Sequence, residues 1–216
     1  LAGQLDDHAY FVRACAELYA ATHEPFWLER AEMVTEVMLE RFWDDAEGGL
    51  FESPADADGV RVRLKDGFDG AELAGNSVAA DNLWRLGMLF ERVDWCERAQ
   101  RSFTFHARRL ATAPWAMPRM LAAMERGAVA PSHVVIVGER ANADTRALIE
   151  VYESRLRPNE DLVVVEEASR GRLTRLVPFA AALPMRDSRA TAYACLDYAC
   201  QQPVHEPSEL AARLDR

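Results

Sequence analysis

Apolar residues recur with helical spacing over the first forty positions of the chain. Residues 5–22 place one apolar face on a helix, made of Leu5, Ala9, Val12, Ala16 and Tyr19. Residues 25–43 also have a helical pattern, and Pro25 suits the first turn of a helix. Because only a few residues join the two segments, the pattern predicts an αα-hairpin.

The same pattern returns 68 positions later, in SVAADNLWRLGMLFER and DWCERAQRSFTFHARRLA. The matched pairs are Leu18 with Leu86, Trp27 with Trp95, Glu29 with Glu97, Arg30 with Arg98, and Ala31 with Ala99. In this register Asp7 and His8 correspond to Gly75 and Asn76. The repeat therefore predicts a second helical hairpin, and it places a polar cluster at the start of the first helix of each hairpin.

A long acidic connection separates the two hairpins. Residues 44–72 hold nine acidic residues, with GLFES and VRVRL as strand-like runs on either side of DADG. This arrangement predicts an inserted β-hairpin. A connection of this length in a helical domain is usually either functional or disordered, and the strand-like runs favour an ordered one.

After residue 130 the periodicity changes. HVVIVG is typical of a buried strand, NADTRALIEVYESRL of a helix and EDLVVVEE of a second strand, which predicts a parallel β-α-β unit. GERANADT lacks the glycine spacing of dinucleotide-binding and P-loop motifs, so phosphate binding is not favoured. TAYACLDYACQQPV indicates a further strand and turn, followed by a helix from about Ser208. The predicted fold is mainly α, with helical hairpins in 1–130 and a small α/β unit in 131–216.

Composition narrows the classes of partner. The chain of 216 residues has a net charge of -10, which argues against binding to a nucleic-acid backbone. No apolar run approaches the roughly 20 residues of a membrane span. The four cysteines are too few and too scattered for a secreted disulfide framework, so a cytoplasmic protein is expected. The chain begins with Leu1, and we expect it to be a piece of a longer protein.

Five blocks in order carry a resemblance to a known family: LDDHAYF, GGLFES, DGAELAGNSVAADNLWRLG, HVVIVG and ATAYACLDYACQQPV. They resemble the C-terminal part of bacterial proteins related to spermatogenesis-associated protein 20. Those proteins join a thioredoxin-like domain to an (α/α)6 toroid similar to glycosidases and N-acylglucosamine 2-epimerase. The resemblance implies a partial toroid of about two and a half hairpins, paired with the missing N-terminal part of the parent chain or with a second copy.

In toroids of this kind the inner helices run parallel, and the loops at one rim surround a central pocket. The resemblance therefore implies that Asp7, His8, Asn76 and Ser77 share a rim, with Asn76 and Ser77 contacting a small carbohydrate ligand. An alternative is that these residues cap their helices, because Asp, Asn and Ser satisfy the free N–H groups of a first turn.

An isomerase, an epimerase or a glycosidase-like enzyme needs an acid and a base that titrate near neutrality. His8 with Asp7 or Asp69 are the catalytic candidates. Trp43 and Phe68 are candidates for stacking on a sugar face, although aromatic residues at helix ends are more often core. No cofactor and no metal are expected for this chemistry.

Two other classes of function stay open. Cys195, Cys200 and His205 suggest thiol or metal chemistry, but a structural zinc site needs four ligands. If 195–200 is one strand, the two cysteines point to opposite faces, which argues against both a disulfide and chelation. A non-catalytic interaction or structural module is the second alternative. Isolated histidines, His133 among them, are given no role.

Overall fold

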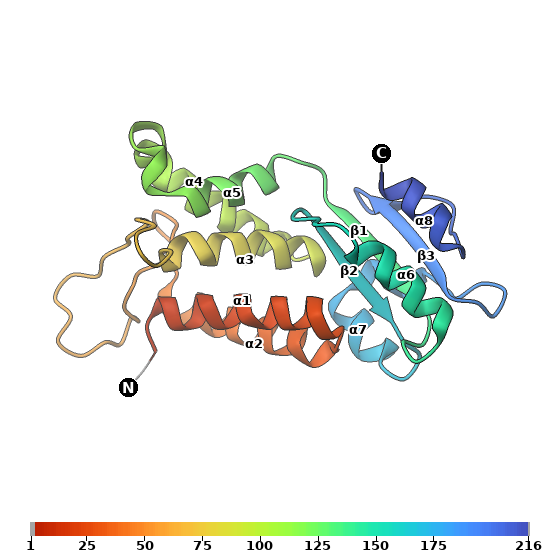
Figure 1. Cartoon of the computed structure of the whole chain (residues 1–216). Coiled ribbons are helices and arrows are strands. Elements are labelled where there is room, and N and C mark those ends of the chain that lie inside the picture. Colours follow the sequence, from red (N-terminus) through yellow and green to blue (C-terminus); the bar gives the residue numbers. More distant parts are fainter. Residues whose placement is uncertain (1–2, 216) are drawn as a thin grey trace. The chain divides into compact units, whose positions relative to one another are not determined.

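The computed structural model describes residues 3–215, which form two compact units with their boundary in the sequence between Val129 and Ala130 (Figure 1). The first unit contains α1 (Leu5–Thr22), α2 (Pro25–Phe42), α3 (Gly75–Leu89), α4 (Val93–Thr112), the 3-10 helix η1 (Pro114–Ala116) and α5 (Pro118–Gly127). The second contains β1 (Ser132–Val137), α6 (Ala143–Glu153), β2 (Glu160–Val165), α7 (Arg170–Leu176), η2 (Pro178–Ala182), β3 (Thr191–Leu196), β4 (Ala199–Cys200) and α8 (Pro207–Leu214). The prediction of a mainly helical chain with a small β-containing unit is confirmed.

Local signals set the first helical hairpin. His23 ends α1 in a left-handed conformation, with a φ of 55° and its N–H bonded to the Tyr19 carbonyl at 2.7 Å. Pro25 then occupies the first position of α2, where its missing N–H costs no hydrogen bond. The two-residue connection turns the chain back, so that α1 packs along α2. The predicted apolar face of α1 is buried, as expected for residues 5–22.

Helices α1 and α3 lie side by side and run in the same direction (Figure 1). Near their middle, the Asn82 side-chain amide donates to the Ala9 carbonyl at 2.8 Å. Towards their carboxyl ends, Arg85 pairs with Glu17 at 3.1 Å. Because the helices are parallel, their amino ends meet on one side of the unit.

The connection between α2 and α3 differs from its prediction. Within the described chain, residues 51–74 form no strand, and the backbone N–H of Glu52 donates to the Leu64 carbonyl at 2.8 Å. The predicted β-hairpin is wrong, because Val60, Val62 and Leu64 remain exposed and no face buries their apolar side. The Lys65 ammonium anchors the segment instead.

Lys65 is held by charge and by aromatic rings. Its ammonium contacts the Asp44 carboxylate at 2.5 Å and the Gly48 carbonyl at 2.8 Å. The Phe105 ring centroid lies 3.9 Å from the same nitrogen. These contacts lower the pKa of Asp44, mainly through the hydrogen bond from Lys65. A long connection without regular structure is thereby fixed against α4.

In the second unit the sheet has the order β2-β1-β3-β4. Strands β1 and β2 are parallel and joined through α6, which confirms the predicted β-α-β unit, and β3 is antiparallel to β1. Alternate side chains such as Val134, Ile136 and Leu162 form a core with Leu148 of α6 and Leu210 of α8. The other face of the sheet carries α7 and η2 (Figure 1).

The end of the sheet corrects the prediction for the cysteines. Asp197 and Tyr198 have φ values of 49° and 58° and turn the chain between β3 and β4. Cys195 and Cys200 therefore pair directly across the two strands and form a disulfide. The argument against a disulfide required 195–200 to be one strand, and this condition does not hold, because a two-residue turn with left-handed residues folds the segment into a hairpin.

Candidate functional site

A cavity of about 130 Å³ lies where α1 and α3 begin. Asp6 of α1 and Asn76 of α3 line it together with Glu52, Asp66, Phe68 and Glu72 from the connection between α2 and α3. Four carboxylates, one amide and one aromatic ring therefore face a small space. Of the residues proposed from the sequence for the starts of these two helices, Asn76 lines the cavity.

A glycine allows the two helix ends to come this close. A Cβ atom at Gly75 would collide with the Asp6 carboxylate and would lie 3.0 Å from Leu5 Cγ. Without that atom, the backbone of Gly75 donates a hydrogen bond to the Asp6 carboxylate. The backbone N–H of Leu5 also donates to the Glu52 carbonyl at 3.0 Å, which joins the connecting segment to α1.

Burial and repulsion from neighbouring carboxylates raise the pKa of two pocket carboxyls. Desolvation raises the pKa of Asp6, and the negative charges of Asp7, Glu72 and Asp66 add to this effect. Desolvation also raises the pKa of Glu52, helped by the charges of Asp66 and Asp6. The hydrogen bond from Gly75 opposes the shift at Asp6. Two carboxyl groups in one pocket thus hold their protons more tightly than free carboxyls do.

Asn76 holds the pocket wall by hydrogen bonds from its side chain to the backbone of the connecting segment. Its side-chain amide donates to the carbonyls of Leu50 and Asp66 at 2.8 and 2.9 Å, and its oxygen accepts from the Leu50 N–H at 2.8 Å. The side chain is fully buried. Asn76 therefore holds both ends of the acidic segment against the start of α3. Its neighbour Ser77 is also buried, with no hydrogen-bond partner for its hydroxyl among residues 3–215.

Asp7 and His8 lie on the first turn of α1, outside the residues that line the cavity. The Asp7 carboxylate accepts from the Gln4 N–H at 2.8 Å, which completes a capping box. His8 Nδ1 donates to the Gln4 carbonyl at 2.8 Å, and its ring packs 5.0 Å from the Phe42 ring. Both side chains thus organise the start of the helix.

Asp69 links two helices rather than meeting His8. Its carboxylate accepts from the Ala74 N–H at 3.0 Å and from the Arg119 N–H at 2.7 Å. These donors lie at the starts of α3 and α5. The structure therefore assigns both carboxylate oxygens of Asp69 to backbone hydrogen bonds.

The two aromatic candidates occupy different places. Phe68 lines the carboxylate pocket and is 50% exposed, and the Arg109 guanidinium lies 5.9 Å from its ring centroid. Trp43 lines a separate cavity of about 400 Å³ with Asp94 and Arg98. The guanidinium groups of Arg98 and Arg101 lie 5.8 and 5.2 Å from the Trp43 ring. Phe68 and Asn76 are therefore the predicted residues that meet in the pocket.

Sequence reasoning missed Asp6 and Glu52. Asp6 is next to the candidate Asp7, but helical spacing turns the two side chains in different directions, and only Asp6 lines the cavity. Glu52 lies within GLFES, which was interpreted as a strand. The available signal was the concentration of acidic residues in 44–72, which indicated a region without selecting a residue.

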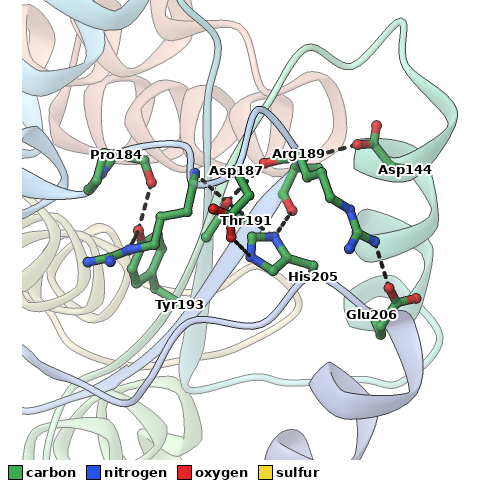
Figure 2. Close-up of polar contacts among 10 residues, drawn as sticks. Asp144, Pro184, Asp187, Arg189, Thr191, Tyr193, His205 and Glu206 are labelled. Atoms are coloured by element: carbon green, nitrogen blue, oxygen red, sulfur yellow. Dashed lines mark hydrogen bonds and ion pairs between the residues drawn. The ribbon is translucent and has the colours of Figure 1, made fainter.

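The metal alternative does not assemble around the cysteines. His205 Nδ1 donates to the Ala190 carbonyl at 2.9 Å, and its Nε2 lies 3.6 Å from the Asp187 carboxylate (Figure 2). The cysteines are paired at the opposite end of β3. Among residues 3–215, no group of three His, Cys, Asp or Glu side chains is placed to hold a metal ion.

Across the described helices, none is both long and apolar enough to span a membrane.

Comparison with known proteins identifies relatives of the chain. No protein-family profile matches the chain. Over 209 residues, 96% of this chain, it is 36% identical to spermatogenesis-associated protein 20 of Homo sapiens and 35% identical to that of Rattus norvegicus. Over 207 residues, 95% of the chain, it is 29% identical to uncharacterized protein B0495.5 of Caenorhabditis elegans. The chain is thus similar along nearly its whole length to one part of spermatogenesis-associated protein 20, and it spans about a quarter of these relatives, 26–27% of their lengths.

Proposed function

We propose that the pocket at the amino ends of α1 and α3 is an acid–base site for a small carbohydrate. The observation that carries the proposal is the pair of carboxyls, Asp6 and Glu52, whose pKa values are both raised within one cavity. A carboxyl whose pKa is raised above its ordinary value is a candidate general acid, and an ionised neighbour can act as the base.

Asp6 and Glu52 suit this role better than Asp7 or Asp69. The Asp7 and Asp69 carboxylates are not among the residues that line the cavity, and their hydrogen bonds from the backbone set the ends of helices. Glu52 and Asp6 instead line the cavity, and the negative charge of Asp6 helps to raise the pKa of Glu52. Isomerisation or epimerisation beside a carbonyl needs such a pair, and so does cleavage of a glycosidic bond.

The other pocket groups fit a sugar. The exposed face of Phe68 offers an apolar surface for the C–H bonds of a pyranose. The amino ends of α1 and α3 supply partial positive charge for hydroxyl oxygens. In this proposal Asn76 and Ser77 support the wall, and Asp7 and His8 hold the first turn of α1 in position.

The size of the pocket favours a site that another part of the molecule completes. A volume of about 130 Å³ is small for a ligand site, since such sites usually enclose roughly 300 Å³ or more. We propose that the two helical hairpins are a segment of a larger (α/α) ring, and that a longer parent chain supplies the rest of the pocket. This agrees with a chain that spans about a quarter of its curated relatives' length, 27% for the human protein.

A non-catalytic role is the second candidate, and the exposed apolar side chains of α1 and α2 favour it. Phe11, Phe26 and Met33 are each exposed to solvent in this structure. A helical segment that presents such residues suits contact with another protein surface. Under this alternative the pocket carboxylates would only interact with water at the amino ends of α1 and α3.

Binding of monosaccharides and aminosugars to the longer parent protein, followed by calorimetry, separates the two candidates. We expect the binding that wild type shows to be lost in Asp6→Asn and Glu52→Gln, because both variants keep the shape and remove the ionisable group. Glu125→Gln, an exposed position of α5, is the matched control and should bind as wild type does. Equal binding by all four proteins, or no binding by any, would favour the non-catalytic role.

A further inference from the structure

Four polar residues form a row across the sheet of the second unit. The strand register places Asp161 of β2 opposite His133 of β1, His133 opposite Cys195 of β3, and Cys195 opposite Cys200 of β4. Directly paired residues of neighbouring strands project from the same face of a sheet. A carboxylate, an imidazole and two sulfurs therefore follow one another along a single face.

His133 is buried without a hydrogen-bond partner. It is 2% exposed, and its ring stacks on Phe179 at 4.8 Å and lies 5.9 Å from the Tyr198 ring. Neither ring nitrogen has a hydrogen-bond partner among residues 3–215. A buried polar group in this state costs free energy, and such groups often mark a redox or catalytic role.

The neighbouring disulfide explains the missing partner. Cys195 and Cys200 are joined, so neither sulfur carries a proton that could be donated to His133. Reduction would give Cys195 an S–H group on the face and at the register position of the imidazole. Cys195 is 3% exposed, whereas Cys200 is exposed to solvent. The two sulfurs thus differ, with one open to a substrate and the other next to a base.

We propose that Cys195 and Cys200 form a reversible thiol–disulfide exchange site in which His133 is the proton acceptor for Cys195. The substrate class is a disulfide of a small molecule or an accessible protein segment, and a dithiol returns the site to its reduced form. The site belongs to the second unit and is independent of the carboxylate pocket.

The exchange takes place in two displacements. The Cys200 thiolate attacks one sulfur of the substrate disulfide, the substrate S–S bond breaks, and the first substrate thiolate leaves and takes a proton from solvent. Cys195 then gives its proton to His133, and its thiolate attacks Cys200 Sγ to form the Cys195–Cys200 bond. The second substrate thiolate leaves with the proton from His133. The substrate gains two electrons, and the cysteine pair loses two.

The electrostatic surroundings support a neutral imidazole. Burial lowers the pKa of His133, and the negative charge of Asp161 partly opposes this shift. The rings that cover His133, Phe179 and Tyr198, are uncharged at neutral pH. A neutral imidazole can accept the thiol proton, and Asp161 stabilises the cation that results.

Resolution of a mixed disulfide measures the role of His133. The chain is reduced with dithiothreitol, desalted and mixed with glutathione disulfide, and quenched samples are analysed by mass spectrometry. We expect a glutathione adduct on Cys200 that wild type converts to the internal disulfide. In His133→Asn this conversion should slow about tenfold at pH 7 and return to the wild-type rate above about pH 9, where a thiol ionises unaided.

The pH dependence separates catalysis from packing. Asp161→Asn keeps the imidazole and should slow the same step in the same direction, so it serves if His133→Asn does not fold. Cys96→Ser and His205→Asn, both away from the row, should resolve the adduct as wild type does. The proposal would be overturned by an adduct on Cys195 in place of Cys200, or by an equal slowing at every pH. An unchanged rate in His133→Asn would also overturn it, and where that variant does not fold, an unchanged rate in Asp161→Asn would do so.

Discussion

The Asn76 side chain makes more hydrogen bonds to the backbone than a helix-capping residue usually does. Capping residues satisfy one or two N–H groups at a helix start, whereas Asn76 makes three hydrogen bonds to the backbone of the acidic connection. The polar composition of DGAELAGNSVAADN indicated that this stretch was unusual. The partners of Asn76 lie 10 and 26 positions away, so local sequence patterns could not reveal them.

Substituting Asn76 tests this role. Asn76→Ala leaves the buried Leu50 N–H without its acceptor, and we expect a loss of about 2 to 3 kcal/mol in the free energy of unfolding. Ser77→Ala removes a buried hydroxyl that makes no hydrogen bond in the described structure, and should change stability by less than about 1 kcal/mol. Urea denaturation of both variants measures the difference. Similar values for the two would contradict the role given to Asn76.

Glu52 gives a prediction about pH. Its pKa is raised in the folded state, so the protonated form favours folding and this contribution is lost as pH rises above the ordinary value of 4.5. Glu52→Gln removes the cost of the buried charge. We therefore expect a higher melting temperature than wild type at pH 7 and no difference well below pH 4.5. Calorimetric melting at several pH values tests this, with Glu125→Gln as control. A variant less stable than wild type at pH 7 would show that Glu52 is stabilising as a carboxylate.

At the scale of elements, helical periodicity predicted the helices of the two hairpins well, whereas alternating patterns predicted some strands and failed for others. The two hairpins follow from apolar faces and short connections, which are local properties. VRVRL alternates as a strand does, but the fold offers no partner and no apolar surface for Val62. The turn at Asp197 and Tyr198 lacks the usual glycine, so the β3–β4 hairpin could not be read from LDYA.

The approach of α1 to α3 depends on Gly75. Gly75→Ala would place a methyl group against the Asp6 carboxylate and Leu5, and we expect a loss of about 1 to 3 kcal/mol from forced movement of the helix ends. Gly171 of α7 has open space around it, so Gly171→Ala should be neutral or stabilise by up to about 1 kcal/mol. Thermal melting compares the two. A neutral Gly75→Ala would mean that the helix ends are not held at this distance.

At the scale of the whole molecule, α2 exposes apolar side chains that suit contact with another surface. Phe26, Met33 and Val37 have helical spacing and are all exposed, although such residues usually lie in contact with other apolar groups. A second copy of the chain or the rest of a longer parent would cover them. Composition alone could not locate this surface, because exposure depends on which helices are present to pack against it.

Self-association should therefore depend on this stripe. We expect sedimentation velocity to show association that grows with concentration, and the double variant Met33→Glu with Val37→Glu to reduce it. Leu156→Glu changes a highly exposed residue of the second unit and should leave association unchanged. A wild-type chain that stays monomeric at every concentration would leave this surface without a role in pairing copies of the chain.

Carbon-detected NMR titration of Asp6 and Glu52 determines whether the pocket carboxyls exchange protons with a carbohydrate. We expect both carboxyls to titrate above their ordinary values of 3.8 and 4.5 in the free protein. A bound monosaccharide should shift both titrations and the ring signals of Phe68, with Glu125 as an unaffected reference. Ordinary titration of Asp6 and Glu52, unchanged by every sugar tested, would contradict the account.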